Sequence, residues 1–360
     1  MSSSFSFEHG GDLEKAARLA GGDLAEITDF SNLLNPSGWP PGLEEALRPQ
    51  LASAFRHPSS GAALKLKIAE RLDVLPEQIF LGAGTTEFIH FLPLLYKPQK
   101  PVIVGPTYGD YAPALRRLGP QPTLLLAREE NNWVIPAEQW KDCLREKPDW
   151  IILSRPNNPL GQSVDRSLLR EMIQQHPAVF FMVDETCIEI ADNPTDHFIL
   201  KPWPANLAVL RSFSKTYAVP GLRLGYMIVA PEIVTSLKTF QMPWTVSPLA
   251  QAAGLFLLNQ DNWLVESQKQ NREEKERVFT QLGALKNFKT FASSMTAFTI
   301  KGLTPGFSSS GLLQRLLVEE KMLIRSLSQH SGLGDIYFRV GLRKPLENEK
   351  LLKALRKMGA

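Results

Sequence analysis

Short apolar runs alternate with amphipathic stretches through the middle of the chain. The apolar runs predict strands at residues 79–81, 102–104, 150–154, 179–184, 207–211 and 224–230. The stretches between them predict helices at residues 85–96, 108–118 and 165–175. An order of this kind is typical of an α/β protein in which helices cover both faces of a largely parallel sheet.

The two ends of the chain follow other patterns. Residues 29–38 fit neither a helix nor a strand and predict an extended arm, followed by helices at 42–54 and 61–72. After Pro248 the pattern predicts helices at 249–258, 262–282 and 347–358, with strands at 296–300, 322–325 and 337–342. We therefore expect an N-terminal arm (1–40) that joins the small domain, a large domain (41–247) and a small α+β domain (248–360).

Composition places the chain among globular proteins. Its 360 residues are 43% hydrophobic and 21% charged, enough for a sizeable core. Lys and Arg number 40 against 37 Asp and Glu, a dispersed excess of +3 that does not argue for nucleic acid and slightly favours small anionic substrates.

Cysteine use and the apolar runs bear on location. The two cysteines, Cys143 and Cys187, lack the spacing of a disulfide framework or a metal site, which predicts a reducing compartment. Residues 1–20 have no signal-peptide pattern, and the apolar run at 88–96 is far shorter than a membrane span. We expect a soluble cytoplasmic protein with no metal, nucleic-acid or membrane partner.

The predicted strands end in polar or glycine-containing turns, where ligands of such sheets bind. In the turn after 207–211, Lys215 supplies an amine that burial can make nucleophilic toward an aldehyde. Ser212, Ser214 and Arg223 supply hydroxyl groups and a forked cation for a phosphate. Both features suit pyridoxal 5'-phosphate, although a solvated strand-end turn is the commoner meaning of a lone Ser-x-Ser-Lys.

Four other strand ends complete the same site. Asp184 is placed to pair with the pyridine nitrogen, or else it caps a turn. Asn158 suits the ring oxygen, or forms a plain Asn-Pro turn. Tyr108 suits stacking on the ring, or is a partly buried aromatic residue, while Gly84 and Thr85 begin a helix whose N–H groups suit a phosphate. Strand ends that each supply one part of one site favour the cofactor over the separate alternatives.

Further motifs carry a resemblance to a known family. They are His9-Gly10-Gly11, Asp29-Phe30-Ser31 with Asn35-Pro36, Pro156-Asn157-Asn158-Pro159, Leu210-Arg211-Ser212 with Lys215, Pro220 to Tyr226, Gln241-Met242-Pro243-Trp244, Leu323 to Ser326, and Phe338-Arg339-Val340 with Arg343. Their order resembles the fold-type-I pyridoxal phosphate enzymes of the histidinol-phosphate aminotransferase branch. Within it, His-Gly-Gly, Gln-Met-Pro-Trp and the Arg339/Arg343 pair resemble the L-threonine-O-3-phosphate decarboxylases of cobalamin biosynthesis.

The resemblance implies a homodimer with a mostly parallel seven-stranded sheet and a role for each matching residue. Lys215, Asp184 and Tyr108 would be catalytic. The cofactor would be held by Gly84, Thr85, Tyr108, Asn158, Asp184, Ser212, Ser214, Lys215, Arg223 and, across the subunit interface, His57. A phosphorylated amino acid would be held by His9, Asn32, Arg325 and Arg339; without the resemblance, the two arginines would equally well form surface ion pairs.

The chain departs from the family pattern at several places. Arg56-His57-Pro58 stands where relatives have Arg-Tyr-Pro, and Cys187 stands in place of an aromatic residue beside the ring oxygen. Leu33 replaces the first asparagine of Asn-x-Asn-Pro, and Leu160 replaces a threonine. These changes leave cofactor binding intact in our interpretation and bear on the substrate.

The expected reaction is decarboxylation of L-threonine O-3-phosphate to (R)-1-aminopropan-2-yl phosphate, with phosphoserine also open. The first alternative is an aminotransferase acting on histidinol phosphate or an aromatic amino acid. A transcription regulator with an aminotransferase-like sensor would need a DNA-binding module, for which we find no room before His9 or after Ala360. A protein that has lost catalysis is disfavoured by the intact set Lys215, Asp184 and Asn158.

Overall fold

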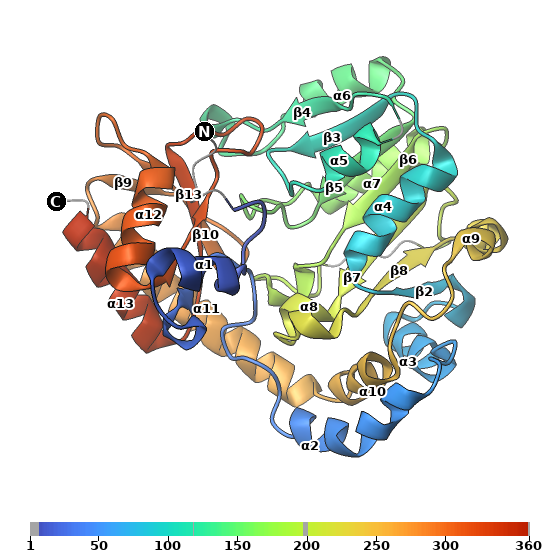
Figure 1. Cartoon of the computed structure of the whole chain (residues 1–360). Coiled ribbons are helices and arrows are strands. Elements are labelled where there is room, and N and C mark those ends of the chain that lie inside the picture. The colour runs from blue at the N-terminus through green and yellow to red at the C-terminus, as the bar shows by residue number, and fades with distance from the viewer. Residues whose placement is uncertain (1–6, 118, 197–200, 359–360) are drawn as a thin grey trace.

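A seven-stranded sheet forms the centre of the larger part of the molecule in the computed structural model, which describes residues 7–117, 119–196 and 201–358 (Figure 1). Its strands are β2 (Ile79–Gly82), β3 (Pro101–Gly105), β4 (Thr123–Leu126), β5 (Trp150–Ser154), β6 (Phe180–Asp184), β7 (Leu207–Ser212) and β8 (Gly225–Val229). The spatial order is β2-β8-β7-β6-β5-β3-β4, and β8 runs antiparallel to both of its neighbours. The other neighbouring pairs are parallel, so all strands except β8 end at one edge.

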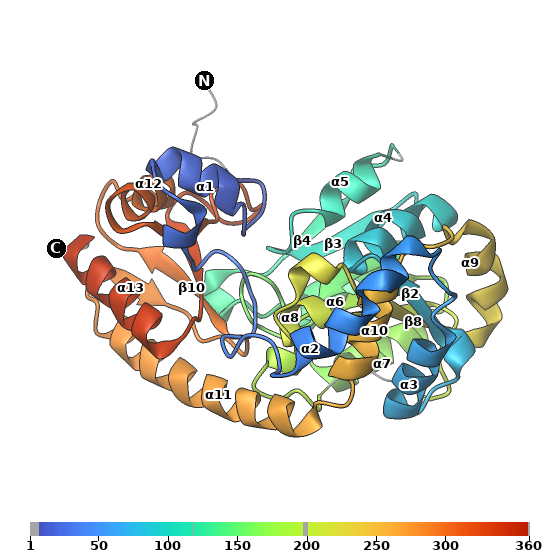
Figure 2. The same ribbon diagram turned by 60° about the horizontal axis from the view of Figure 1, so that its bottom comes forward.

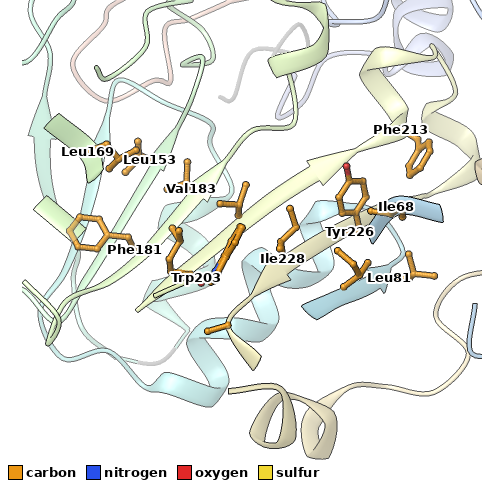
Figure 3. Packing of buried hydrophobic residues seen from close by; sticks show 14 of the residues in the cluster. Ile68, Leu81, Leu153, Leu169, Phe181, Val183, Trp203, Phe213, Tyr226 and Ile228 are labelled. Atoms are coloured by element: carbon orange, nitrogen blue, oxygen red, sulfur yellow. The ribbon is translucent and has the colours of Figure 1, made fainter. Parts of the chain in front are cut away.

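Both faces of this sheet are buried because apolar residues continue through the strands. On one face, side chains such as Leu153, Phe181 and Val183 pack in a single cluster (Figure 3). Helices α3 (Ala62–Leu72), α6 (Ala137–Arg145), α7 (Arg166–Gln175) and α10 (Pro248–Leu257) contribute to that cluster. On the other face, Ile152 and Met182 pack with α4 (Thr85–Tyr96), α5 (Tyr111–Arg116) and α9 (Val234–Phe240). The side chains of successive strand residues thus pack on opposite faces of the sheet.

The smaller part is built on an antiparallel sheet of order β12-β13-β10-β9. Its strands are β9 (Phe288–Thr290), β10 (Ala297–Gly302), β12 (Arg325–Ser326) and β13 (Tyr337–Gly341), and its helices are α12 (Ser309–Glu320) and α13 (Pro345–Met358). The N-terminal helix α1 (Leu13–Ala20) packs in the same apolar cluster. Strand β1 (Thr28–Asp29) pairs in parallel with β11 (Met322–Leu323), so the two ends of the chain share one core.

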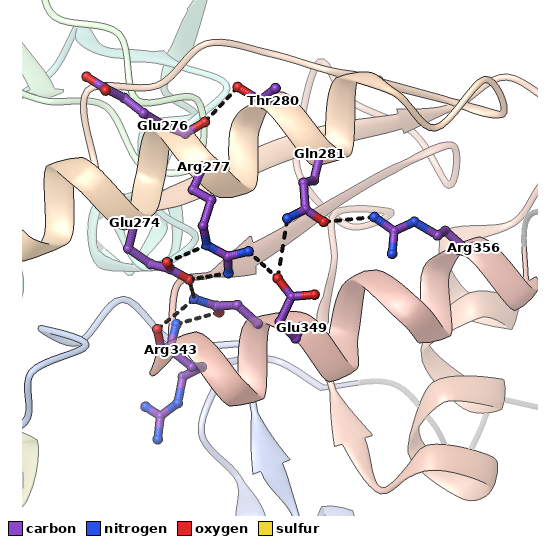
Figure 4. A network of polar contacts seen from close by, with 9 residues as sticks. Glu274, Glu276, Arg277, Thr280, Gln281, Arg343, Glu349 and Arg356 are labelled. Atoms are coloured by element: carbon purple, nitrogen blue, oxygen red, sulfur yellow. Dashed lines mark hydrogen bonds and ion pairs between the residues drawn. The ribbon is translucent and has the colours of Figure 1, made fainter.

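Helix α11 (Asp261–Gly283) runs from the larger part to the smaller part (Figure 2). Figure 4 shows how α13 is fixed against it: Arg277 pairs with Glu274 on its own helix and with Glu349 on α13. Gln281 accepts a hydrogen bond from Arg356 at 2.8 Å. The remaining helical segments are α2 (Leu43–Leu47), α8 (Phe213–Thr216) and the 3-10 turns at Leu24–Glu26, Arg48–Phe55, Pro76–Gln78, Glu129–Asn131, Ile188–Ile190, Pro220–Leu222 and Pro231–Ile233.

Several boundaries differ from the sequence prediction. The helix expected at 108–118 begins at Tyr111, because Tyr108 and Asp110 form a turn closed by their own side chains; its expected end, Leu118, lies outside the described residues. The helix expected at 42–54 becomes 3-10 from Arg48, next to Pro49, which has no N–H for an α-helical bond. The strand expected at 322–325 is two short strands in different sheets.

The elements that were missed altogether include α1, α6, α9, α12, β1, β4 and β9. The segment before α12 is rich in serine and glycine, a pattern that suggests a loop. In the structure Ser308 begins the helix instead, and its hydroxyl accepts the N–H of Gly311 at 3.0 Å. None of the helices in the described ranges combines the length and apolar character needed to cross a bilayer.

Phe181 tests the packing of the central sheet. Its side chain is fully buried, so Phe181→Ala should lower the free energy of unfolding by about 3–5 kcal/mol. Val265→Ala on α11, where the side chain is 65% exposed, should change it by no more than about 0.5 kcal/mol. Urea denaturation measures both, and similar losses for the two variants would contradict the burial pattern.

Candidate active site

The strand registers bring the predicted site segments to one edge of the large sheet. Gly82 of β2 and Ser212 of β7 both lie opposite Gly225, the first residue of β8. Farther along the same edge, Asp184 of β6 lies opposite Ser154 of β5. Asp184 ends β6, and the segments that follow β2, β5 and β7 carry Gly84, Asn158 and Lys215, so these residues meet although they are far apart in the sequence.

Beneath these turns, a buried ion network joins three neighbouring strands. Glu185 accepts a hydrogen bond from Arg155 Nη1 at 3.1 Å and from Arg211 Nε at 3.0 Å. All three side chains are at most 3% exposed. The backbone continues the link, since the Arg155 N–H donates to Asp184 O at 2.8 Å and the Glu185 N–H donates to Leu210 O at 2.9 Å. The network therefore fixes the ends of β5, β6 and β7 relative to one another.

Lys215 lies in the short helix α8, directly after β7. Ser212 begins that helix by accepting the Ser214 N–H at 3.1 Å. The N-terminal arm covers this turn, because the Asn35 N–H donates to Lys215 O at 2.9 Å. Burial lowers the pKa of the Lys215 amine below its ordinary value, and the charges of Arg339 and Arg223 lower it further. A neutral, nucleophilic amine is thereby favoured.

Asp184 presents an oriented carboxylate at the end of β6. Its Oδ2 accepts the Tyr111 hydroxyl at 2.7 Å, and its Oδ1 accepts the Thr186 N–H at 2.9 Å. Burial, followed by the charge of Asp184, raises the pKa of Tyr111 well above its ordinary value, so this tyrosine remains a donor. The carboxylate is thus held by two donors in a site where it is only 6% exposed.

Tyr108 lies next to this pair. Its ring meets that of Tyr111 edge-on at 5.6 Å between centroids, and its hydroxyl donates to Asp110 at 2.7 Å. It lies in the turn before α5 rather than at the helix start predicted for it.

A narrow cup is formed where α4 begins. Gly84 has φ +82°, and a Cβ placed there would lie 2.5 Å from Arg223 Nη2. Arg223 Nη2 also donates to Ala83 O at 3.2 Å, which holds the guanidinium against the first turn of the helix. Thr85 adds a hydroxyl 3.3 Å from that of Thr186. Helix-start N–H groups and a guanidinium are the donors that a phosphate needs, so the cup fits the phosphate of pyridoxal phosphate.

Two buried arginines lie on the small-domain side of this edge. Arg339 donates to Asn158 Oδ1 and to Ser31 O, and burial with the charge of Arg325 lowers its pKa to about 10. Arg325 donates to Phe7 O at 2.6 Å and to Glu8 O, and burial lowers its pKa. A cleft of about 350 Å³ runs from Tyr108 past His9 to Arg325. It is lined by both parts of the chain.

The predicted site residues fall into three groups. Those at the sheet edge are Gly84, Thr85, Tyr108, Asn158, Asp184, Ser212, Ser214, Lys215 and Arg223. His9, Arg325 and Arg339 flank them, and Asn32 lies close by with its Nδ2 donating to Asp29 at 2.6 Å. His57 is not brought to this edge: it is exposed and stacks on Trp244 with 4.6 Å between ring centroids.

The departures from the family pattern are partly explained by packing. Leu33 and Cys187 lie in one small apolar cluster with Met295, so the residues that replace an asparagine and an aromatic residue pack together. Burial raises the pKa of the Cys187 thiol to about 11, which keeps it protonated near neutral pH. Leu160 packs in a separate cluster with Trp133 and Tyr337.

Sequence reasoning missed several residues of this site. Tyr111 follows Tyr108 by three residues, a spacing that places both on one side of a turn and gave a usable signal. No signal in the sequence marks the network of Arg155, Glu185 and Arg211, because burial of charged residues follows from tertiary structure. Within the described ranges, no group of three or more His, Cys, Asp or Glu side chains is arranged to hold a metal ion.

Comparison with known proteins agrees with this fold. The sequence matches the family Aminotransferase class I and II over residues 45–355, and the chain belongs to that family. It is 31% identical to threonine-phosphate decarboxylase of Salmonella typhimurium over 98% of this chain and 96% of that protein. It is 27% identical to histidinol-phosphate aminotransferase 1 of Mannheimia succiniciproducens over 98% of this chain and 94% of that protein.

Two further similarities concern the extent of the match and the fold. The bifunctional adenosylcobalamin biosynthesis protein CobDQ of Leptospira interrogans is 28% identical over 96% of this chain, which spans 40% of the length of that protein. The crystal structure of L-threonine-O-3-phosphate decarboxylase from Porphyromonas gingivalis has a TM-score of 0.80 at 24% identity, covering 91% of this chain and 98% of that one. Family and fold confirm the predicted architecture, an enzyme, and pyridoxal phosphate as its cofactor.

Glu185 tests the buried network. Glu185→Gln removes the charge that pairs with both buried guanidinium groups, although Arg155 keeps its ion pair with Asp196, and should lower the free energy of unfolding by about 3–5 kcal/mol. The matched control is Glu138→Gln on the surface of α6, where loss of an exposed pair with Lys141 should change stability by about 0–1 kcal/mol. A stability loss for Glu185→Gln as small as that of the control, in urea denaturation, would show that the network does not fix the strand ends.

Proposed function

We propose that the protein decarboxylates a phosphorylated amino acid with pyridoxal phosphate, and that the substrate is L-threonine O-3-phosphate. The product would be (R)-1-aminopropan-2-yl phosphate, a precursor for the nucleotide loop of cobalamin. The observation that carries this proposal is the pair of buried arginines, Arg325 and Arg339, beside the edge that holds Lys215. A phosphoamino acid presents two anions, and two guanidinium groups suit both.

Each residue of the edge has a defined task in this proposal. Lys215 would hold the cofactor aldehyde, Asp184 its ring nitrogen and Asn158 its ring oxygen, with Tyr108 against the ring face. The phosphate of the cofactor would lie in the cup of Gly84, Thr85, Ser212, Ser214 and Arg223. When bound, pyridoxal phosphate supplies an electron sink for the bond broken at the substrate Cα.

The choice of bond is set by this chain's own anchors. Arg339 lies beside Asn158, and its charge acts on Lys215, so it is placed for the substrate carboxylate. Arg325 lines the cleft beyond Tyr108 and is placed for the phosphate, with His9 nearby. Two fixed anions set the rotation about the Cα bonds and align the carboxylate for release as CO2. The Lys215 amine, freed when the substrate amine takes its place, would accept the proton that the substrate ammonium group gives up and would donate it to the Cα from which CO2 has left.

An aminotransferase is the second candidate, and the 27% identity to a histidinol-phosphate aminotransferase favours it. The same cofactor edge would serve, but the Cα–H bond rather than the carboxylate would be aligned. Lys215 would then move a proton from Cα to the cofactor-side carbon.

We propose that two copies of the chain associate and that His57 acts in the site of the neighbouring copy. His57 lies in a surface region with exposed apolar side chains: Phe55 is 93%, Met242 63% and Trp244 61% exposed. Single exposed apolar residues are common on protein surfaces, whereas a group of them indicates a surface that contacts another protein. The cytoplasmic location, inferred from unpaired Cys143 and Cys187, and the domain boundaries at 40 and 247 stay predictions.

The reaction is tested with L-threonine O-3-phosphate and pyridoxal phosphate. We expect CO2 release that needs no 2-oxoacid, and we expect Lys215→Ala to lose both this activity and the absorbance band of the lysine-bound cofactor, because the variant lacks the buried amine proposed to hold the aldehyde. Phosphoserine is compared in parallel. Amino transfer to 2-oxoglutarate without CO2 release would support the aminotransferase instead.

Mixed dimers test the role of His57. Lys215→Ala and His57→Ala subunits are each expected to form weakly active or inactive homodimers. A mixed dimer of the two holds one site with both residues intact if His57 acts across the interface, so it should recover about half of the wild-type activity. Absence of recovery in separated mixed dimers would contradict action across the interface, and a monomer by sedimentation would contradict the association itself.

A further inference from the structure

His330 occupies a fixed position in the cleft that contains Arg325. It follows β12 in a turn, where its N–H donates to Leu327 O at 2.9 Å and its carbonyl accepts the Leu333 N–H at 3.0 Å. Gly332, two residues after His330, packs so closely on Pro106 and Leu126 of the larger part that an added Cβ would lie 3.1 Å from Pro106. The imidazole is therefore held at the junction of the two parts, on the wall of the cleft.

The charges around His330 come from three directions. Arg325 and Arg339 face it from β12 and β13. The N-terminal segment contributes Glu8 and His9 to the cleft, and the larger part contributes Tyr108, Asp110 and Arg116. Asp110 is already engaged by the Tyr108 hydroxyl and lies 3.5 Å from His9 Nε2. Burial lowers the pKa of His330 to about 3, and the two guanidinium groups add to that effect, so the imidazole is neutral near neutral pH.

Unpartnered polar atoms gather at and beside this cleft. Within the described residues, His330 Nδ1 is buried without a hydrogen-bond partner, and so are Thr107 Oγ1, Arg339 Nε and Asn32 Oδ1. Leaving a buried polar atom unpaired is unfavourable. Thr107 and His330 both line the cleft, and their two unpaired atoms favour a polar ligand that supplies the missing partners.

We propose that His330 is a substrate-binding residue that holds the substrate phosphate together with Arg325 and takes up one proton when the phosphate binds. This inference rests on the proposed phosphorylated substrate. A phosphate dianion placed beside the imidazole reverses the local field set by the arginines and favours the imidazolium form. The proton comes from solvent, no covalent bond changes, and the product carries the same phosphate, so release of product returns the proton.

Proton uptake by His330 would allow the cleft to distinguish a phosphate from a second carboxylate. A dianion raises the pKa of a neighbouring imidazole more than a monoanion does, because its attraction for the imidazolium charge is larger. Protonation converts a neutral contact into a charge-assisted hydrogen bond, which is about twice as strong. A ligand with one negative charge would gain less from His330 than a phosphate gains.

The variant His330→Asn tests this, because an amide can hydrogen-bond to a phosphate but cannot take up a proton. Titration calorimetry of the holoenzyme with inorganic phosphate, in buffers of different ionisation enthalpy near neutral pH, should show that the wild type takes up about one proton more per site than the variant does. We expect the KM for L-threonine O-3-phosphate to rise about tenfold or more while kcat changes little, since one charge-assisted bond is worth about 1.5–3 kcal/mol. His176→Asn, outside the cleft, should match the wild type in both measurements.

The outcomes separate this inference from the proposed reaction. If the wild type decarboxylates phosphothreonine but His330→Asn has the same KM and proton uptake, the His330 inference is wrong and the proposed function stands. If phosphothreonine is not turned over but inorganic phosphate binds with proton uptake that His330→Asn loses, the inference stands for another phosphorylated substrate. If the wild type takes up no more protons than His330→Asn when phosphate binds, or does not bind phosphate, the inference is overturned. His330→Gln replaces the asparagine variant should that one fail to bind cofactor.

Discussion

The arrangement of the whole site depends on one buried interaction, the pairing of Glu185 with Arg155 and Arg211. These residues come from three neighbouring strands, and their charges are removed from water. A buried pair of this kind is retained only with good geometry, and it contributes more to a unique arrangement than to net stability. Here that arrangement is the relative position of the turns that carry Asn158, Asp184 and Lys215. The chemistry at the edge therefore depends on ions that do not touch the ligand.

The second constraint is that the sheet is covered on both faces, which leaves its carboxyl edge as the place where polar groups of the strands reach the surface of the fold. The small part then closes over this edge with positive charge. Arg325 on β12 lies directly opposite Arg339 on the neighbouring strand β13, so two like charges are held side by side. The charge of Arg325 lowers the pKa of Arg339, and an anionic ligand bound between them would relieve the repulsion between the two guanidinium groups.

Much of the fold and the cofactor edge was predictable, because strands buried on both faces give continuous apolar runs and their ends carry the functional turns. The long helix α11 and the final helix α13 were also found from their periodicity. Two other elements were missed. Strand β4 is short, lies at the edge of the sheet and is partly exposed, and α12 begins in a run of serines, which suggests a loop. Burial of Glu185 and the position of His330 at the junction depend on contacts between distant segments. Local pattern carries no record of those contacts.

The central claim is that the Lys215 amine holds the cofactor at the edge where Asp184 lies. Borohydride reduction of the protein loaded with pyridoxal phosphate, followed by peptide mass spectrometry, tests this most directly, because reduction makes the bond to the amine permanent. The account predicts one pyridoxyl group per chain, on the peptide that contains residue 215. A label on another lysine, or no label in protein saturated with the coenzyme, would contradict it.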